Sequence, residues 1–203
     1  MSADPMSSAE LKKAKRDVRR RVLEARDAIP PAERDRLSAE VTSRFLALPE
    51  VDGAGTVMAF WTFGSELATM PLIETLHAAG VRVALPRIVE GDIEPVTYAP
   101  GDPTTETAFG ALEPSGGEVL SPTDVDVVAT PAVVFDRRGA RVGYGGGFYD
   151  RLFNKVRPDT PRIGVGFGVQ LLPEGEWLPG GHFDLPVDAV VTESETVRCS
   201  RDR

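Results

Sequence analysis

A glycine-rich stretch contains the residues best suited to chemistry. Residues 139–151 read GARVGYGGGFYDR, and five of these thirteen residues are glycine. Glycine loses the most backbone freedom on folding, so such a cluster indicates unusual backbone angles or the close approach of another group. The stretch follows the apolar segment VDVVATPAVVF and precedes a helical pattern, which predicts a strand–loop–helix unit that can bind a polyphosphate through backbone N–H groups. A turn that serves only the chain geometry is the simpler alternative.

Two charged residues in this stretch suit a nucleotide. Arg141 precedes the loop and can bind phosphate oxygens through two N–H groups at once. Asp150 falls in the first turn of the predicted helix, where a carboxylate beside phosphates requires a cation such as Mg²⁺ between them. The alternative for Asp150 is a simple interaction with the helix dipole. The stretch is neither a Walker loop, which ends Gly-Lys-Ser or Gly-Lys-Thr, nor a dinucleotide fingerprint, which has glycine where Phe148 stands.

A basic segment near the beginning of the chain is the second candidate. Residues 1–29 hold eight Lys and Arg against five Asp and Glu, a balance of +3, whereas the remainder carries −11. Apolar residues recur every three or four positions over residues 10–29, which predicts a helix. Lys15 and Arg19 lie four residues apart and share a helix face, which we expect to point away from the apolar stripe. That face is either solvated or binds an anion, and the acidic remainder argues against nucleic acid on residues 12–26.

The composition indicates one domain over residues 1–203. Of its 203 residues, 41% are hydrophobic and 27% are charged, which allows a continuous core. No apolar run is long enough to cross a bilayer, and the first residues lack the pattern of an export signal. Cys199 is the single cysteine, so an intrachain disulfide is excluded. We therefore expect a cytoplasmic monomer without membrane or nucleic-acid partners.

The elements that must position these residues alternate between strands and helices. Beyond the first helix, a second is expected after Pro30-Pro31 up to Leu48, a third over residues 68–79 with Gly80 as its cap, and a fourth over residues 148–156. Strands are expected over residues 55–63, 81–86, 93–98, 125–135, 162–167 and 187–192. This alternation predicts the α/β class with a mainly parallel sheet. Residues 99–124 form a long connection of a kind that is usually functional or disordered, although its FGALEP segment suggests order.

The segment DRRGARVGYGGGFYDR resembles the signature of the 5-formyltetrahydrofolate cyclo-ligases, also called 5,10-methenyltetrahydrofolate synthetases. The matching positions are Asp136, Gly139, Arg141, Gly143, Gly145, Gly147, Tyr149, Asp150 and Arg151. Four other segments are similar to the family: KRDVR in the first helix, FWTFGSELAT, FGALEP and FDLPVDAVVTE. The resemblance covers most of the chain.

This resemblance implies a fold, a reaction and a set of site residues. The fold is a three-layer α/β/α sandwich with a mainly parallel sheet, like that of sugar-phosphate isomerases and CoA transferases. The reaction is the ATP-dependent closure of 5-formyltetrahydrofolate to 5,10-methenyltetrahydrofolate, with Mg²⁺ as the metal. The implied catalytic residues are Arg141 and Lys15, and the implied metal ligands are Asp150 and Asp188, with Asp184 as a further candidate.

The implied binding residues come from the first helix, the FWTFGSELAT segment and the glycine stretch. Those for ATP are Lys15, Arg16, Asp17, Val18, Arg19, Arg141, Val142, Gly143, Tyr144, Gly145, Gly146, Gly147, Phe148 and Tyr149. Those for the folate are Arg19, Trp61, Glu66, Tyr144, Gly145, Gly146, Gly147 and Phe148. Within the second set, Glu66 is expected to hold the pterin.

The chain departs from the family pattern inside the glycine loop. Tyr144 and Gly146 stand where the family often has Lys or Arg. The positive charge near the γ-phosphate must then come from Arg141, Lys15 or Arg151.

The histidines and the general fold leave alternatives open. His182-Phe183-Asp184 replaces the family's His-Asp or Trp-Asp, and we expect His182 to be a surface residue and His77 to be structural. A sugar-phosphate isomerase or a CoA-transferase-like enzyme would need a catalytic carboxylate or histidine and no ATP. A non-enzymatic nucleotide-binding regulator is the remaining alternative.

Overall fold

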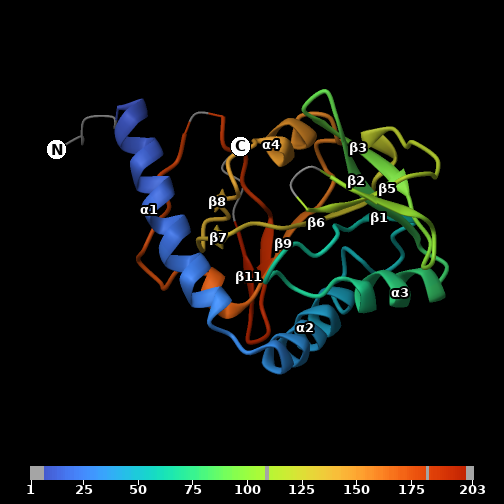
Figure 1. Ribbon diagram of the computed structural model, residues 1–203, viewed down its shortest axis with the longest axis horizontal. Helices are drawn as coiled ribbons and strands as arrows, with labels where there is room; N and C mark the ends of the chain where they lie inside the picture. Colours follow the sequence, from blue (N-terminus) through green and yellow to red (C-terminus); the bar gives the residue numbers. More distant parts are fainter. Residues whose placement is uncertain (1–6, 108–109, 182, 200–203) are drawn as a thin grey trace.

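The computed structural model describes residues 7–107, 110–181 and 183–199. Its centre is a seven-stranded sheet with the strand order β11-β10-β9-β6-β1-β2-β3 (Figure 1). Five inner strands run parallel: β1 (Thr56–Met58), β2 (Arg82–Val89), β6 (Val127–Thr130), β9 (Arg162–Val165) and β10 (Ala189–Val191). The edge strands β3 (Asp92–Thr97) and β11 (Thr196–Arg198) are antiparallel to their neighbours. The mainly parallel α/β sheet is thus confirmed.

Helices cover both faces of the sheet. The helices are α1 (Ser8–Asp27), α2 (Pro31–Leu46), α3 (Met70–Ala78) and α4 (Phe148–Phe153). Successive strand residues point to opposite faces, so Val57 packs in the same cluster as Phe45 of α2 and Ile73 of α3, whereas Met58 packs with Leu152 of α4. In Figure 1, α2 and α3 lie below the sheet and α4 lies above it. These are the three layers that the family resemblance implies.

The first helix stands beside this sandwich (Figure 1). It begins with a capping box in which the Ser7 hydroxyl accepts from the Glu10 N–H at 3.3 Å and Glu10 accepts from the Ser7 N–H at 2.8 Å. Its buried Val22 packs against a small separate sheet formed by β7 (Val134–Phe135) and β8 (Arg141–Val142). Because the glycine loop follows β8 directly, this packing places α1 beside the loop.

Two of the expected strands end five residues earlier than predicted. The strand expected over residues 125–135 ends at Thr130, because Pro131 has no N–H to continue the ladder, and the following residues leave the main sheet to form β7. The strand expected over residues 55–63 ends at Met58, and residues 59–69 form a loop that carries part of the candidate site. The four expected helices are confirmed with shifted ends, and Gly80 adopts the expected left-handed conformation with φ +78°.

The long connection contains regular structure. It forms a hairpin of β4 (Thr104–Glu106) and β5 (Leu112–Pro114), followed by the short 3₁₀ helix η1 (Pro122–Asp124). The second half of the FGALEP segment is therefore ordered, whereas its Phe109 lies outside the described residues. A second 3₁₀ helix, η2 (Gly168–Gln170), follows β9. In the described ranges, no helix is both long and apolar enough to cross a bilayer.

Candidate functional site

The glycine loop between β8 and α4 presents unused backbone donors. Gly145 and Gly147 have φ angles of +107° and +65°, which side-chain-bearing residues rarely adopt. The carbonyl of Gly143 accepts from Arg19 Nε at 2.8 Å, and that of Gly146 accepts from Arg151 Nη2 at 2.9 Å. Within the described part of the chain, the backbone N–H groups of residues 143–147 donate no hydrogen bond. A run of unpaired N–H groups with cationic neighbours is an anion-binding arrangement.

One face of α1 carries Arg19 and two further cations, Lys15 and Arg26. Arg19, Val22 and Arg26 follow Lys15 by four, seven and eleven residues, which puts all four on one side of the helix. Lys15 Nζ forms an ion pair with Asp184, and Arg19 reaches the loop carbonyl of Gly143. Val22 is 3% exposed, so this face points inward, and the expectation that it faces away from the apolar side is wrong. The basic side chains can lie on this inward face because oxygen atoms of residues 65, 143, 144 and 184 pair with them.

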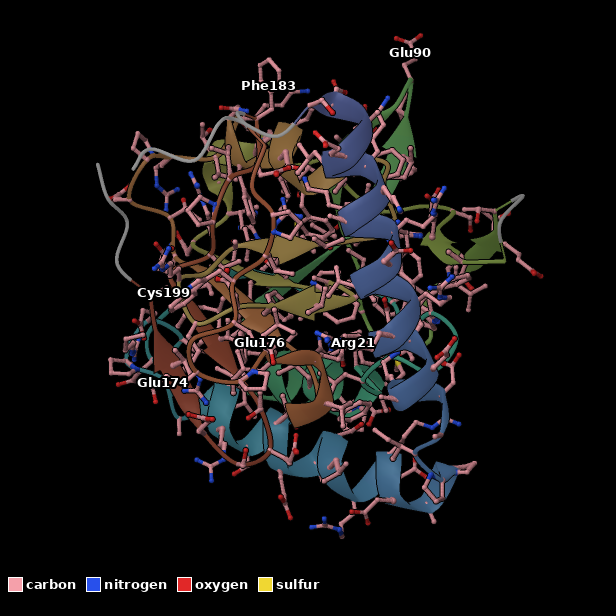
Figure 2. The ribbon with its side chains drawn as sticks, turned by 90° about the vertical axis from the view of Figure 1, so that its left-hand side faces the viewer. Arg21, Glu90, Glu174, Glu176, Phe183 and Cys199 are labelled. Carbon is pink, nitrogen blue, oxygen red and sulfur yellow. The ribbon has the colours of Figure 1, made fainter. Side chains whose placement is uncertain are left out.

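The other implied residues of α1 lie on different sides of the helix. Arg16 is exposed, and Asp17 and Val18 line a separate hollow that faces residues 172–179. Arg21 extends toward Glu176 on this side, with 3.3 Å between Arg21 Nη2 and Glu176 Oε2 (Figure 2). The structure therefore brings Arg19 to the glycine loop and Lys15 to Asp184, whereas these three residues lie elsewhere on the helix.

Arg141 is more deeply placed than the sequence indicates. It lies within β8, directly before the loop, and its side chain is 7% exposed. Its Nη2 donates to Asp150 Oδ1 at 2.7 Å, and its Cζ lies 4.9 Å from the centre of the Phe153 ring. Burial lowers the pKa of Arg141, and the Asp150 carboxylate opposes that shift. Its buried Nε has no hydrogen-bond partner among the described residues.

The candidate metal ligands do not form one cluster. Among the described residues, no group of three or more His, Cys, Asp and Glu side chains is arranged to hold a metal. Asp188 precedes β10, and its Oδ2 accepts from the Arg162 N–H at 2.7 Å at the beginning of β9. Asp184 is paired with Lys15. Asp150 lies beside the loop, with Oδ1 bonded to Arg141 and to the Leu185 N–H, and with Oδ2 unbonded within the described ranges. One carboxylate with phosphate oxygens is a fitting donor set for Mg²⁺.

A second group of residues surrounds Glu66 in the loop after β1. Glu66 is 9% exposed, and its Oε2 accepts from the Phe63 N–H at 3.2 Å. Burial raises the pKa of Glu66 to about 7, and the charge of Arg26 opposes the rise. The half-exposed Tyr144 ring meets Phe63 edge-on at 5.6 Å between centroids. The loop after β1 and the glycine loop therefore meet at Glu66.

Val142 and Phe148 support the glycine loop, whereas Trp61 packs elsewhere. Val142 pairs with Val134 and is buried against α1. Phe148 begins α4, and a Cβ on Gly146 would lie 2.3 Å from its ring, so Gly146 is needed for close packing. Trp61 contacts Tyr98 edge-on at 5.4 Å on the sheet side of the loop after β1.

Tyr149 lies next to both groups, with a partly buried ring and a buried hydroxyl. Burial raises the pKa of Tyr149, the Glu66 carboxylate adds to the rise, and the Arg141 charge opposes it, so both charged groups act on this hydroxyl. In the described part of the chain this hydroxyl has no hydrogen-bond partner.

Tyr149→Phe is expected to stabilise the fold by about 1–2 kcal/mol, because it removes a buried hydroxyl that lost water without gaining a partner. Urea unfolding followed by circular dichroism measures this change. Tyr144→Phe is the matched control and is expected to destabilise, since the Tyr144 hydroxyl accepts from Arg26 Nη2 at 2.8 Å. A loss of stability in Tyr149→Phe would contradict the assignment.

The sequence did not indicate Arg26, which is 2% exposed and hydrogen-bonded to the loop after β1 and to the glycine loop. Its spacing of eleven residues from Lys15, which returns to the same helix face, is the signal that could have found it. Asp136, in contrast, has a structural role, because it accepts from the N–H groups of Arg138, Ala140 and Leu178 at 2.9–3.0 Å.

His77 and Cys199, the remaining described candidates for chemistry, supply no nucleophile to this region. His77 is exposed at the end of α3, and His182 lies outside the described residues. Burial raises the pKa of Cys199 to about 11, so its thiol is a poor nucleophile at neutral pH. The region therefore offers positioning and charge instead of a nucleophilic side chain.

Comparison with known proteins gives a consistent result. The family model described as the 5-formyltetrahydrofolate cyclo-ligase family matches residues 11–193. The chain is 36% identical to the 5-formyltetrahydrofolate cyclo-ligase of Escherichia coli over 86% of its own length and 97% of the relative. It is 32% identical to that of Mycolicibacterium smegmatis over 89% of its length and 94% of the relative.

A solved structure shares the fold along nearly the whole chain. The 5,10-methenyltetrahydrofolate synthetase of Aquifex aeolicus superimposes with a TM-score of 0.77 at 33% identity, and the match covers 93% of this chain and 94% of that one. The synthetase of Mycoplasma pneumoniae superimposes with a TM-score of 0.72 at 20% identity, which concerns the fold alone.

Proposed function

Because the chain belongs to the 5-formyltetrahydrofolate cyclo-ligase family, we propose that this enzyme converts 5-formyltetrahydrofolate and ATP to 5,10-methenyltetrahydrofolate, ADP and phosphate. The names of its relatives support the folate substrate. The single observation that carries the ATP half of the proposal is the run of N–H groups at residues 143–147 without partners among the described residues, with Arg19 on the loop and Arg141 directly before it. We further expect a cytoplasmic monomer.

The proposed chemistry addresses a poor leaving group. The formamide oxygen on N5 does not depart readily, so transfer of the γ-phosphoryl group from ATP to this oxygen makes it a phosphate ester. N10 then attacks the activated carbon, the five-membered ring closes, and the oxygen leaves as inorganic phosphate. Phosphoryl transfer depends on positioning and on neutralisation of charge more than on a nucleophilic side chain. This requirement matches the groups near the loop.

The protein groups have distinct tasks in this proposal. The loop N–H groups bind the phosphate oxygens, as backbone donors do at other phosphate sites. Arg141 and Lys15 balance the charge that develops on the transferring phosphoryl group. Each is held by a carboxylate, Asp150 for Arg141 and Asp184 for Lys15, so both cations are in place before the nucleotide arrives.

A magnesium ion fits this arrangement at one point. Asp150 would hold it through Oδ2, together with phosphate oxygens and water, and the ion would neutralise phosphate charge. Asp188 remains the second candidate, although its Oδ2 accepts from the Arg162 N–H. Asp150 thus has two tasks, because its other oxygen orients Arg141.

The folate lies, in this proposal, on the side of Glu66. The pterin presents an amide N–H and an amino group next to each other, and a carboxylate can accept from both. Tyr144 provides a flat surface beside this carboxylate, and Trp61, which belongs to the same loop as Glu66, is assigned to the folate by the family resemblance alone. The formyl group then points toward the glycine loop, where the γ-phosphate is bound.

Turnover by the purified chain tests the proposal. With 5-formyltetrahydrofolate, ATP and Mg²⁺ together, we expect the absorbance of the methenyl product to appear with one ADP released per product. Omission of the folate is expected to abolish ADP release, and omission of ATP to abolish product. ATP hydrolysis that is independent of the folate, or isomerase or CoA-transferase activity without ATP, would contradict it.

A further inference from the structure

Arg26, in the last turn of α1, is a buried cation where three segments meet. Its Nε donates to Ser65 Oγ at 3.0 Å, and its Nη2 donates to the Tyr144 hydroxyl at 2.8 Å. Ser65 belongs to the loop that carries Glu66, and Tyr144 belongs to the glycine loop. One guanidinium therefore joins α1 to both loops of the candidate site.

The third nitrogen of this guanidinium lies near Glu66. Arg26 Nη1 is 3.9 Å from Glu66 Oε1 and has no hydrogen-bond partner among the described residues. A buried cation is stable only if nearby groups compensate its charge, and Glu66 is the carboxylate that forms an ion pair with this nitrogen. The pair is loose enough for Glu66 to retain acceptor capacity for a ligand.

The surroundings of Glu66 make it dependent on this cation. The groups that favour its charged form are Arg26 from α1, the Phe63 N–H from its own loop and the Tyr144 hydroxyl from the glycine loop. The Glu66 charge also raises the pKa of the Tyr149 hydroxyl of α4. The Asp27 carboxylate accepts a hydrogen bond from the Ser65 hydroxyl. Of these groups, Arg26 alone carries a positive charge. Without it, a nearly buried carboxylate would take up a proton more readily.

We propose that Arg26 is a positioning residue for the folate: it keeps the Glu66 carboxylate charged and holds Tyr144 beside it. This inference rests on the proposed function, because Glu66 and Tyr144 are assigned there to the folate. Arg26 acts through these two residues and does not need to touch the substrate.

The inference also gives α1 a wider role. Lys15 and Arg19 serve the phosphate side of the loop, and Arg26 serves the folate side. These positions span eleven residues of helix, or about 16 Å at 1.5 Å per residue. A single rigid helix therefore sets the distance between the two substrate subsites.

Arg26→Gln tests the inference, with Arg21→Gln on the same helix as the matched control. Arg21 pairs with Glu176 at the surface, away from both loops. In Arg26→Gln we expect kcat/KM for 5-formyltetrahydrofolate to fall about 30-fold at neutral pH, with KM for ATP changed less than about twofold. The acid limb of the folate kcat/KM profile should move to higher pH, because the loss of a nearby positive charge raises the pKa of Glu66. Arg21→Gln should behave as wild type.

Two further variants cover the case in which Arg26→Gln does not fold. Arg26→Lys retains the charge, so we expect it to keep the wild-type acid limb while losing part of the hold on Tyr144. Tyr144→Phe removes that hold and the hydrogen bond from the Tyr144 hydroxyl to Glu66, so it should raise the folate KM and move the acid limb to higher pH by less than Arg26→Gln does. Equal losses at every pH in Arg26→Gln, with no rescue by lysine, would show that Arg26 only supports the fold.

Titration of the Glu66 carboxyl by ¹³C NMR separates this inference from the proposed function. Its pKa should be higher in Arg26→Gln than in wild type, whatever the substrate is. An unchanged Glu66 pKa would overturn the inference even if the wild-type enzyme forms the methenyl product. Absence of wild-type turnover together with a raised Glu66 pKa would instead overturn the proposed function and leave the Arg26–Glu66 coupling established.

Discussion

Arg141→Ala is expected to lower kcat by about 10³-fold, in the range found when an arginine that neutralises a transferring phosphoryl group is removed. The structural reason is the placement of its guanidinium, which Asp150 holds beside the glycine loop. Rates of methenyl formation under saturating ATP and folate measure the effect. KM for both substrates should change much less than kcat, because the charge develops only in the transition state.

The burial of Arg141 requires a stability control in this experiment. Removal of one partner of a buried ion pair typically destabilises by about 3–5 kcal/mol, since the other charge is left without compensation. Assays should therefore run at a temperature where circular dichroism shows the variant to be folded. Arg137→Ala is the matched variant, because Arg137 lies in the same region but pairs with Glu195 at 2.5 Å near the surface, and it should retain full activity. A folded Arg141→Ala enzyme with a kcat within about tenfold of wild type would refute the role.

Glu66→Gln is expected to weaken folate binding about 30-fold while leaving ATP binding unchanged, because a hydrogen bond to a charged acceptor is worth about 1.5–3 kcal/mol. Calorimetry with each substrate separately measures both affinities. Glu74→Gln, which neutralises an exposed carboxylate on α3, should leave both affinities as in wild type. Equal losses of folate and ATP affinity would mean that Glu66 supports the whole site and not the pterin.

The same residue gives the wild-type enzyme a pH dependence. Burial raises the pKa of Glu66 to about 7. The deprotonated form is the acceptor for the pterin, and its fraction falls as the pH decreases through that value. The folate kcat/KM should therefore decline below about pH 7, by up to tenfold per pH unit. In Glu66→Gln this acid limb should disappear, because the amide does not titrate.

The parts of the fold that could be predicted have a strong periodic signal. The helices around Val22, Phe45 and Ile73 were identified because their apolar residues recur at helical spacing. The β7–β8 sheet could not be found, since two-residue strands contain too few positions to show alternation. Pro131 was a visible sign that the strand at residues 125–135 should end, and its missing N–H decided the outcome.

The sequence predicted the types of residue in the candidate site but not which of them interact with one another. The family signature indicated Arg141 and Asp150 separately, yet their ion pair depends on how β8 and α4 meet across nine residues. Arg26 escaped notice because a lone arginine among several in a basic helix carries no local signal; its partners come from residues 65 and 144. The unpaired hydroxyl of Tyr149 is likewise a consequence of three-dimensional packing.

The hydrogen bonds of the Asp136 carboxylate order the hairpin before the glycine loop during folding and not during nucleotide binding. It is 1% exposed and gathers three N–H groups, two from the β7–β8 hairpin and one from residue 178. The β7–β8 hairpin, from which the glycine loop begins, is therefore already ordered when the protein has folded. Its conformational entropy is lost before any nucleotide is present. Encounter with the nucleotide then has less disorder to remove, which favours tight binding from few contacts.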